Sequence, residues 1–237
     1  MIKDDELQSL QVGHRTRLRK KFLDGQLTEY EILELLLTYA IPRRDVRILS
    51  RQLYKKYGSI QQLLAAPFEA LIENEGIKEN TATFFKLIHK IMELDCKGAL
   101  DNTPIFHNYE ALQRYCRLIT EGKDIEEFHV LYLDSQFILI KDDLHSSGTT
   151  DWAAVYVREI VKKALNLGAH SVALLHNHPT PNTSFSFQDI EITKEIQQAL
   201  KSVSISLYDL FLVSAGEFHS ARNMRLLDRK TKQYTND

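Results

Sequence analysis

The chain has 237 residues, of which 43% are hydrophobic, and its formal net charge is −2. This length supports a sizeable core in one large or two small domains, and the near-neutral charge excludes a uniformly basic surface for nucleic acid. Cys96 and Cys116 are the only cysteines, which argues against a disulfide scaffold and against a Cys-x-x-Cys metal site. Any metal site would therefore use histidine and carboxylate ligands.

Membrane and secretion signals are missing from the sequence pattern. No apolar run approaches the roughly 20 residues that a membrane span needs, and the start MIKDDELQSL is too acidic and polar for a secretory signal. Both cysteines fit ordinary thiols in a reducing compartment. We therefore expect a soluble, cytoplasmic protein with no membrane partner.

The first hundred residues are predicted to be helical. Apolar residues recur three and four positions apart in segments 27–40, 45–57 and 79–94. Pro42 breaks the chain after the first of these, Gly58 ends the second, and Pro67 opens the short helix FEALIEN. These patterns predict an all-helical domain over residues 1–98.

A short linker and a change of period follow. The segment CKGALDNTP, residues 96–104, combines Gly, Pro, Asn and Asp between periodic regions and predicts the domain boundary. Beyond it we expect a hairpin at 127–134 and 137–140, a helix at 153–167, a strand at 171–178, a helix at 187–201 and a strand at 205–214. This β-β-α-β-α-β order predicts an α+β domain with a mixed sheet covered by helices over residues 103–227. The polar tail, 228–237, is expected to fray.

The stretch LLHNHPTPNTSFSFQD, residues 174–189, has the composition of a metal site. His176 and His178 are two apart, so on a strand both imidazoles point to one face, at the carboxyl edge where α/β sheets usually bind ligands. Two prolines stiffen the loop that leads to Ser186, a suitable helix N-cap, and Asp189 falls at the third helical position. Two imidazoles and a carboxylate suit Zn²⁺, and three protein ligands leave a fourth tetrahedral position open, as in catalytic sites.

A simpler interpretation exists for each of these residues. Ser186 and Asp189 alone are most simply a helix cap, because an acidic residue three after serine is common at helix starts. A lone histidine is most often a surface residue or a satisfied core residue. Two histidines, a proline, a serine and an aspartate in one register favour a metal site over these interpretations.

The arrangement H-x-H-P, six residues, S-x-x-D resembles the JAMM motif of MPN-domain metalloproteases. The text EEFHVLYLDSQFILIKDDLHSSGTT, followed by YVREIVKKALNLGAHSVALLHNHP, is similar to the bacterial RadC family, and the similarity covers most of residues 103–225. The resemblance implies a cytidine-deaminase-like MPN fold with Zn²⁺ held by His176, His178 and Asp189. It also implies hydrolysis of an amide or isopeptide bond in a peptide or protein substrate.

The same resemblance assigns further roles. Ser186 matches a serine that helps to stabilise the oxyanion. RadC-like sequences resemble E-x-F before the first strand, which selects Glu126, two residues before Phe128, as the catalytic glutamate. Glu127 is an adjacent rival and Glu159 a more distant one. Zinc would lower the pKa of its bound water toward about 7, and the glutamate would accept the proton.

Two departures and one further match concern the surroundings of the metal. The loop HNHPTPNTSFS lacks the glycine and the acidic residue of the family text HNHPSGDPTPS, which weakens the transfer of a substrate more than that of the metal. Val157 stands where a proline commonly precedes the family's REI. Gly148, Thr149 and Thr150 match a GT turn, which either lines the substrate groove or is an ordinary turn.

The helical domain is similar to the helix-hairpin-helix region of RadC proteins at ENEGIKENTA. Only Gly76 of the Gly-x-Gly pattern remains, and Lys78 replaces the second glycine, so close approach of this backbone to DNA phosphate is disfavoured. The basic segment HRTRLRKKF is the better candidate for phosphate, and its simpler interpretation is a solvated helix face with Leu18 and Phe22 packed inward. The alternative functions are thus a DNA-repair-linked protein with an accessory MPN domain, or an inactive metal-binding scaffold.

Overall fold

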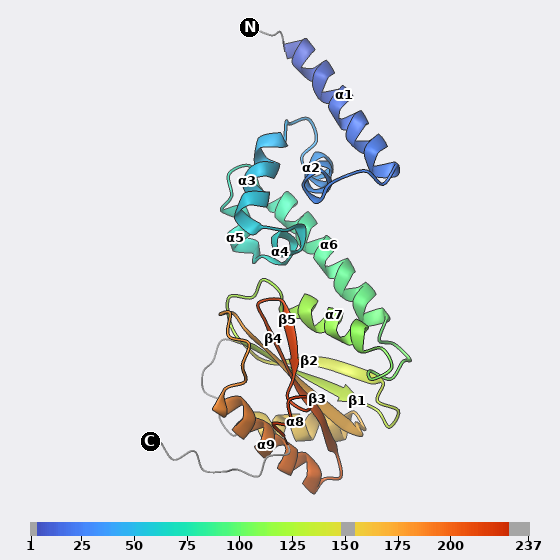
Figure 1. The fold of residues 1–237 in the computed structure, drawn as a ribbon, viewed down its shortest axis with the longest axis vertical. Coiled ribbons are helices and arrows are strands. Elements are labelled where there is room, and N and C mark those ends of the chain that lie inside the picture. Colours follow the sequence, from blue (N-terminus) through green and yellow to red (C-terminus); the bar gives the residue numbers. More distant parts are fainter. Residues whose placement is uncertain (1–3, 148–154, 228–237) are drawn as a thin grey trace. The chain divides into compact units, whose positions relative to one another are not determined.

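The computed structural model describes residues 4–147 and 155–227, and the chain forms two compact units, Met1–Ile91 and Met92–Asp237 (Figure 1). We call them the helical unit and the sheet unit. The division falls within helix α6, Glu79–Gly98, because late residues such as Cys96 pack in the core of the sheet unit. The first three residues of the segment CKGALDNTP are therefore helical. The expected GT turn at 148–150 and the tail 228–237 lie outside the described residues.

The described part of the helical unit contains no strand, as predicted. Capping explains where its helices begin, since Thr28 forms a capping box with Glu31 and Ser59 accepts the backbone N–H of Gln62. Buried leucines on successive helices form the core. Besides the first part of α6, the helices are α1 (Asp4–Leu23), α2 (Glu29–Ala40), α3 (Arg47–Tyr57), α4 (Ile60–Ala65) and α5 (Phe68–Ile72).

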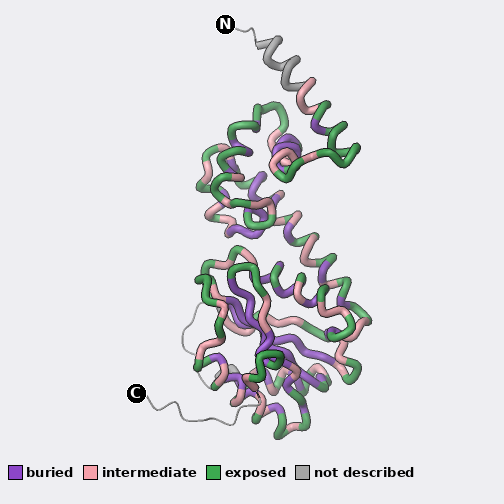
Figure 2. The backbone as a smooth tube through the Cα atoms, in the orientation of Figure 1, coloured by how far each residue is buried: buried purple, intermediate pink, exposed green. Residues whose placement is uncertain are grey.

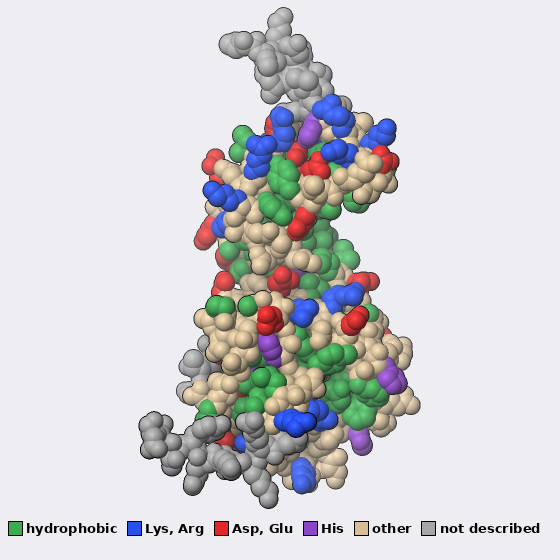
Figure 3. Space-filling model, viewed as in Figure 1, with side chains coloured by type: hydrophobic (Ala, Val, Ile, Leu, Met, Phe, Trp, Pro, Cys, Tyr) green, Lys and Arg blue, Asp and Glu red, His purple; other side chains and the backbone are tan. Residues whose placement is uncertain are grey.

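The basic segment on α1 is only partly as expected. Leu18 is buried, but Phe22 is 54% exposed, so its predicted inward packing is wrong. Phe22 lies in the last turn of α1, and the chain turns two residues after the helix, at Gly25 (φ 68). Figure 3 shows Lys and Arg side chains gathered over the helical unit on the visible face. DNA contact by this segment stays a prediction.

A tight turn at residues 73–78 joins α5 to α6. Gly76 has a φ of 93, a conformation that favours glycine, and a Cβ there would meet side-chain atoms of Arg44 and Leu49 at 3.4 Å. The turn is therefore packed against α3 and the loop before it. Its identity as a degenerate helix-hairpin-helix that touches DNA stays a prediction.

The sheet unit contains a mixed sheet, as predicted, but the sheet has five strands where the sequence predicted four. The strand order is β2-β1-β3-β4-β5, with β3 and β4 parallel and the other neighbours antiparallel. Strand β2 begins two residues later than the predicted 137–140 and continues to Ser147. Strand β5 was not predicted, because the short segment EFHS carries no clear alternation. The strands are β1 (Glu127–Leu133), β2 (Leu139–Ser147), β3 (Ser171–His178), β4 (Ser206–Ser214) and β5 (Glu217–Ser220).

Helices cover both faces of this sheet. Helix α7 (Tyr109–Thr120), which was not predicted, packs on one face, and α8 (Val155–Asn166) and α9 (Phe187–Ser202) pack on the other (Figure 1). Side chains of β3 alternate between two cores: Leu174 belongs to the α8/α9 core and Leu175 to the α7 core. Figure 2 shows buried backbone along the central strands.

Two negative expectations concern cysteine and membrane. Cys96 and Cys116 are both buried and unpaired, as expected, and burial raises the pKa of the Cys116 thiol. Within residues 4–147 and 155–227, no helix combines the length and the apolar character that membrane crossing requires.

Candidate metal centre

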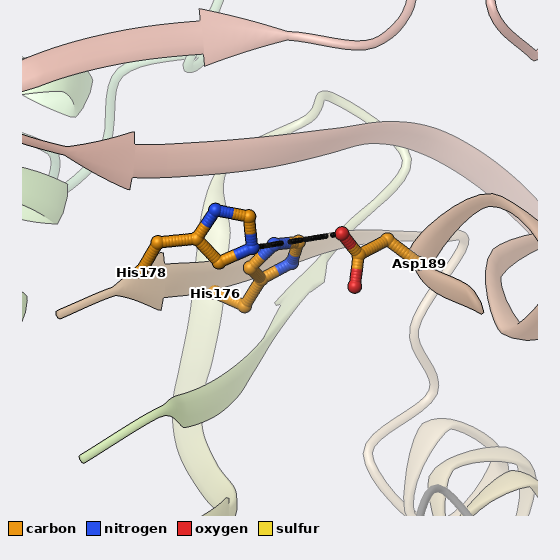
Figure 4. Close-up of side chains that lie close together, drawn as sticks. All are labelled: His176, His178 and Asp189. Atoms are coloured by element: carbon orange, nitrogen blue, oxygen red, sulfur yellow. Dashed lines mark hydrogen bonds and ion pairs between the residues drawn. The ribbon is translucent and has the colours of Figure 1, made fainter. Parts of the chain in front are cut away.

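The three predicted ligands meet where β3 ends and α9 begins (Figure 4). His176 and His178 lie at alternate positions of β3, so their imidazoles share the face that Leu174 presents to α8 and α9. Asp189 reaches the same point from the first turn of α9. As the sequence predicts, the end of a strand supplies both histidines and the start of the next helix supplies the aspartate, with one loop between them.

The spacing of the ligand atoms suits a tetrahedral metal. The Nε2 atoms of His176 and His178 are 3.2 Å apart, and Oδ2 of Asp189 lies 3.5 Å from the first and 3.6 Å from the second. Zinc bonds of about 2.0–2.1 Å place neighbouring ligands of a tetrahedron about 3.3–3.4 Å apart. The three atoms thus surround a point at bonding distance from each, and the donor set fits Zn²⁺.

Hydrogen bonds outside the cluster orient its ligands. Nδ1 of His178 lies 2.7 Å from the carbonyl oxygen of Asn182, which can only accept, so Nδ1 carries a hydrogen, and in the neutral ring Nε2 presents a lone pair. The backbone N–H of Ser186 donates to Oδ2 of Asp189 at 2.7 Å. Asn182 lies in the loop whose text departs from the RadC pattern, so that loop still supports a ligand.

Ser186 and Asp189 also form the helix cap that was weighed against a metal site. The Asp189 backbone N–H donates to Oγ of Ser186 at 3.1 Å, which completes a capping box. The two interpretations are compatible, because the cap fixes the carboxylate that completes the cluster. Accepting this bond uses a lone pair of Oγ and not its proton.

The electrostatics of the cluster favour a positive charge at its centre. Burial alone would raise the pKa of Asp189, which is 4% exposed, but hydrogen bonds with His176 and His178 hold it well below its usual range. The hydrogen bond with Asp189 raises the pKa of His178, although burial opposes it. In the absence of a metal, this carboxylate therefore stabilises a proton at the position where a cation would bind.

The three candidate glutamates lie in different places. Glu126 directly precedes β1 and is exposed; the antiparallel pair Phe128–His176 puts it beside His178, and its charge contributes to the raised pKa of that histidine. Glu127 is buried on the opposite face, where it pairs with other side chains. Glu159 lies on α8. Geometry favours Glu126, whose catalytic role stays a prediction.

Asn177 is a neighbour of the cluster that the sequence reasoning missed. This residue lies between the two histidines in the sequence. Its side chain is buried and accepts a hydrogen bond from the backbone N–H of Glu127. Strand alternation predicts the face of Asn177, because a residue between two positions that share one face of a strand must point to the other face. Its partner, however, is set by the pairing of β3 with β1.

The segment that contains the cluster matches a known protein family. A family model described as the RadC-like JAB domain matches residues 106–226, which include all the predicted site residues. The UPF0758 protein FN0909 of Fusobacterium nucleatum subsp. nucleatum is 37% identical over 218 residues, covering 88% of this chain and 94% of that protein. The similarity therefore extends well beyond the sheet unit.

Proposed function

Because the chain belongs to the RadC-like JAB domain family, we propose that it is a zinc-dependent hydrolase of peptide or isopeptide bonds. The observation that carries the proposal is the tetrahedral spacing of the three ligand atoms of His176, His178 and Asp189. A cluster of this geometry leaves the fourth position of a zinc ion for water or substrate. Such open sites are typical of catalytic zinc rather than structural zinc.

The residues around the cluster supply the remaining chemistry. Bound zinc would polarise a carbonyl and lower the pKa of a coordinated water toward about 7. Glu126, exposed and on the metal side of β1, would accept a proton and return it to the leaving amine. The Ser186 hydroxyl would donate to the developing oxyanion, a contribution of about 3 kcal/mol for one donor. This division of roles predicts amide hydrolysis of a peptide or protein substrate.

The test compares two glutamate variants of the full chain. Glu126→Gln is expected to keep about one zinc per chain and to lose hydrolysis by about a hundredfold or more, because proton transfer contributes at least that much. Glu159→Gln, whose carboxylate pairs with Lys162 on α8, is the matched control and should retain both properties. Zinc is measured by metal analysis, and hydrolysis on a library of fluorogenic peptides with α-amide and Lys ε-amide linkages.

The outcomes separate the alternatives. Protein without zinc at micromolar free zinc, or unchanged hydrolysis in Glu126→Gln, contradicts the proposal. Stoichiometric zinc with no cleavage of any library member supports an inactive metal-binding scaffold instead.

A further inference from the structure

Asn177 makes two hydrogen bonds to backbone atoms beside the candidate catalytic glutamate. Its Oδ1 accepts the N–H of Glu127 at 2.8 Å, and its Nδ2 donates to the carbonyl oxygen of Ile125 at 3.1 Å. The residue is only 3% exposed, so its bond to Glu127 is shielded from water, and its bond to Ile125 is partly shielded. One buried side chain therefore holds the chain on both sides of Glu126.

These two bonds fix the backbone of Glu126. The Ile125 carbonyl belongs to the peptide plane before Glu126, and the Glu127 N–H belongs to the plane after it. With both planes held, the φ and ψ angles of Glu126 are set, and so is the direction of its side chain. The described β1–β3 pairing ends at Phe128–His176, so the amide of Asn177 continues the attachment of β1 to β3 beyond the last backbone pair.

The faces of the sheet explain why this residue suits the task. His176 and His178 point toward α8 and α9, and Asn177, between them, points to the opposite face. Phe128 packs in the α8/α9 core, and the alternation of β1 extended to Glu126 puts that residue on the same face, opposite the face of Glu127 and Asn177. Strand β3 therefore presents the histidine ligands on one face and, through Asn177 on the other face, hydrogen-bonds to the segment that carries Glu126.

We propose that Asn177 is a positioning residue that sets Glu126 over the metal centre, an inference that rests on the proposed function. Asparagine alone offers one acceptor and one donor at this length: aspartate lacks the donor, leucine lacks both groups, and glutamine is longer. Removing the amide leaves the zinc ligands in place and frees the peptide planes around Glu126. The glutamate then loses its fixed distance to the metal, as loosely supported catalytic groups do.

The test uses the full chain loaded with Co²⁺, whose visible absorption reports protonation at the open coordination position. A nearby carboxylate raises the pH at which that absorption changes, so Glu126→Gln is expected to lower the midpoint by about one unit. Asn177→Ala should lower it in the same direction by at least about half as much. In the double variant, Asn177→Ala should add almost nothing, because it acts through Glu126. Stoichiometric metal should be retained in all variants.

Leu175→Ala is the matched control, because Leu175 is two residues earlier on β3 and faces the same side as Asn177. It loosens the strand without touching residues 125–127, and its midpoint should stay within about 0.2 units of wild type. Asn177→Ser is a milder truncation that also breaks the pair of hydrogen bonds to Ile125 and Glu127. It replaces Asn177→Ala if that variant fails to fold.

The results distinguish the two proposals. An unshifted midpoint in the Asn177 variants, with a shift in Glu126→Gln, overturns the positioning role and leaves the proposed function intact. Equal shifts in Leu175→Ala and Asn177→Ala also overturn it. If wild type binds no Co²⁺ or Zn²⁺, the proposed function falls and this inference falls with it.

Discussion

Two clusters of histidine and carboxylate lie on opposite faces of the same sheet. On the α8/α9 face, His176, His178 and Asp189 bring three ligand atoms within 3.6 Å of one another. On the α7 face, His129 lies between Glu127 and Asp142, 3.3 Å and 3.1 Å from their carboxylate oxygens. Tyr115 on α7 donates to the far oxygen of Asp142 at 2.7 Å.

The difference between the clusters is one of direction, not of residue type. In the first, two ring nitrogens and one oxygen face a common point, and outer bonds from Asn182 and Ser186 leave the ligand atoms aimed inward. In the second, both ring nitrogens of His129 are bound to carboxylates on opposite sides of the ring, so neither is left for a metal. The first cluster therefore has the arrangement that a metal ion needs, with ligand atoms directed at one point. The second has the arrangement of a structural ion pair, with the histidine between two carboxylates.

The largest expected effect is the loss of metal from one cluster only. His178→Gln should reduce zinc from about one per chain to near zero at micromolar free zinc, because a neutral amide is not among the side chains that commonly bind this metal. His129→Gln, the same change on the other face, should keep zinc. Metal analysis after dialysis, with circular dichroism to verify folding, makes the comparison. Zinc retained in His178→Gln, or lost in folded His129→Gln, would reverse the assignment of the two clusters.

The second cluster should respond to pH. Burial alone would lower the pKa of His129, but hydrogen bonds to Asp142 and Glu127 outweigh burial and raise it to about 9. The folded state therefore holds this proton more tightly than the unfolded chain, whose histidine pKa is about 6.5. The stabilisation is complete below pH 6.5 and is lost as pH rises through about 9.

NMR titration of the His129 ring in metal-free protein checks this prediction. We expect a midpoint near 9 in wild type and a clearly lower one in Asp142→Asn, which removes the carboxylate that does most to stabilise the imidazolium. Amide signals of β1 followed in urea should show less resistance to unfolding at pH 9.5 than at pH 6.5. A His129 midpoint near 6.5 would show that the ion-pair chain is not formed.

The sequence predicted the first cluster and not the second, for a physical reason. His176, His178, Ser186 and Asp189 lie within fourteen residues, so strand parity and helix capping suffice to bring them together. His129 and Asp142 meet only through the register of β1 with β2, which includes irregularities near both ends. No local pattern specifies that register, so their pairing could not be read from spacing.

The same limit explains the other differences. The mixed sheet, its helices and the metal cluster follow from periodicity and one compact motif. Helix α7 was missed although Asn108 caps it and its apolar side packs on the sheet, because the prediction passed from the short linker at 96–104 directly to the hairpin that begins at 127. The direction of the Glu126 side chain and the hydrogen bonds of Asn177 to its neighbours depend on the pairing of β1 with β3. The paired residues are about fifty positions apart, so no local pattern predicts them.

The smallest effect concerns the caps of the helices on the two faces. Ser186→Ala removes the acceptor for the Asp189 N–H at the start of α9 and should cost about 1 kcal/mol of stability. Because the same cap holds a metal ligand, zinc affinity should fall by about fivefold, the equivalent of that energy. Asn108→Ala removes the corresponding acceptor for the Ala111 N–H on α7 and should cost similar stability with unchanged zinc affinity. Chelator competition measures the zinc affinity, and urea unfolding measures the stability. Equal losses of zinc affinity in both variants would mean that the α9 cap stabilises the helix without positioning the ligand.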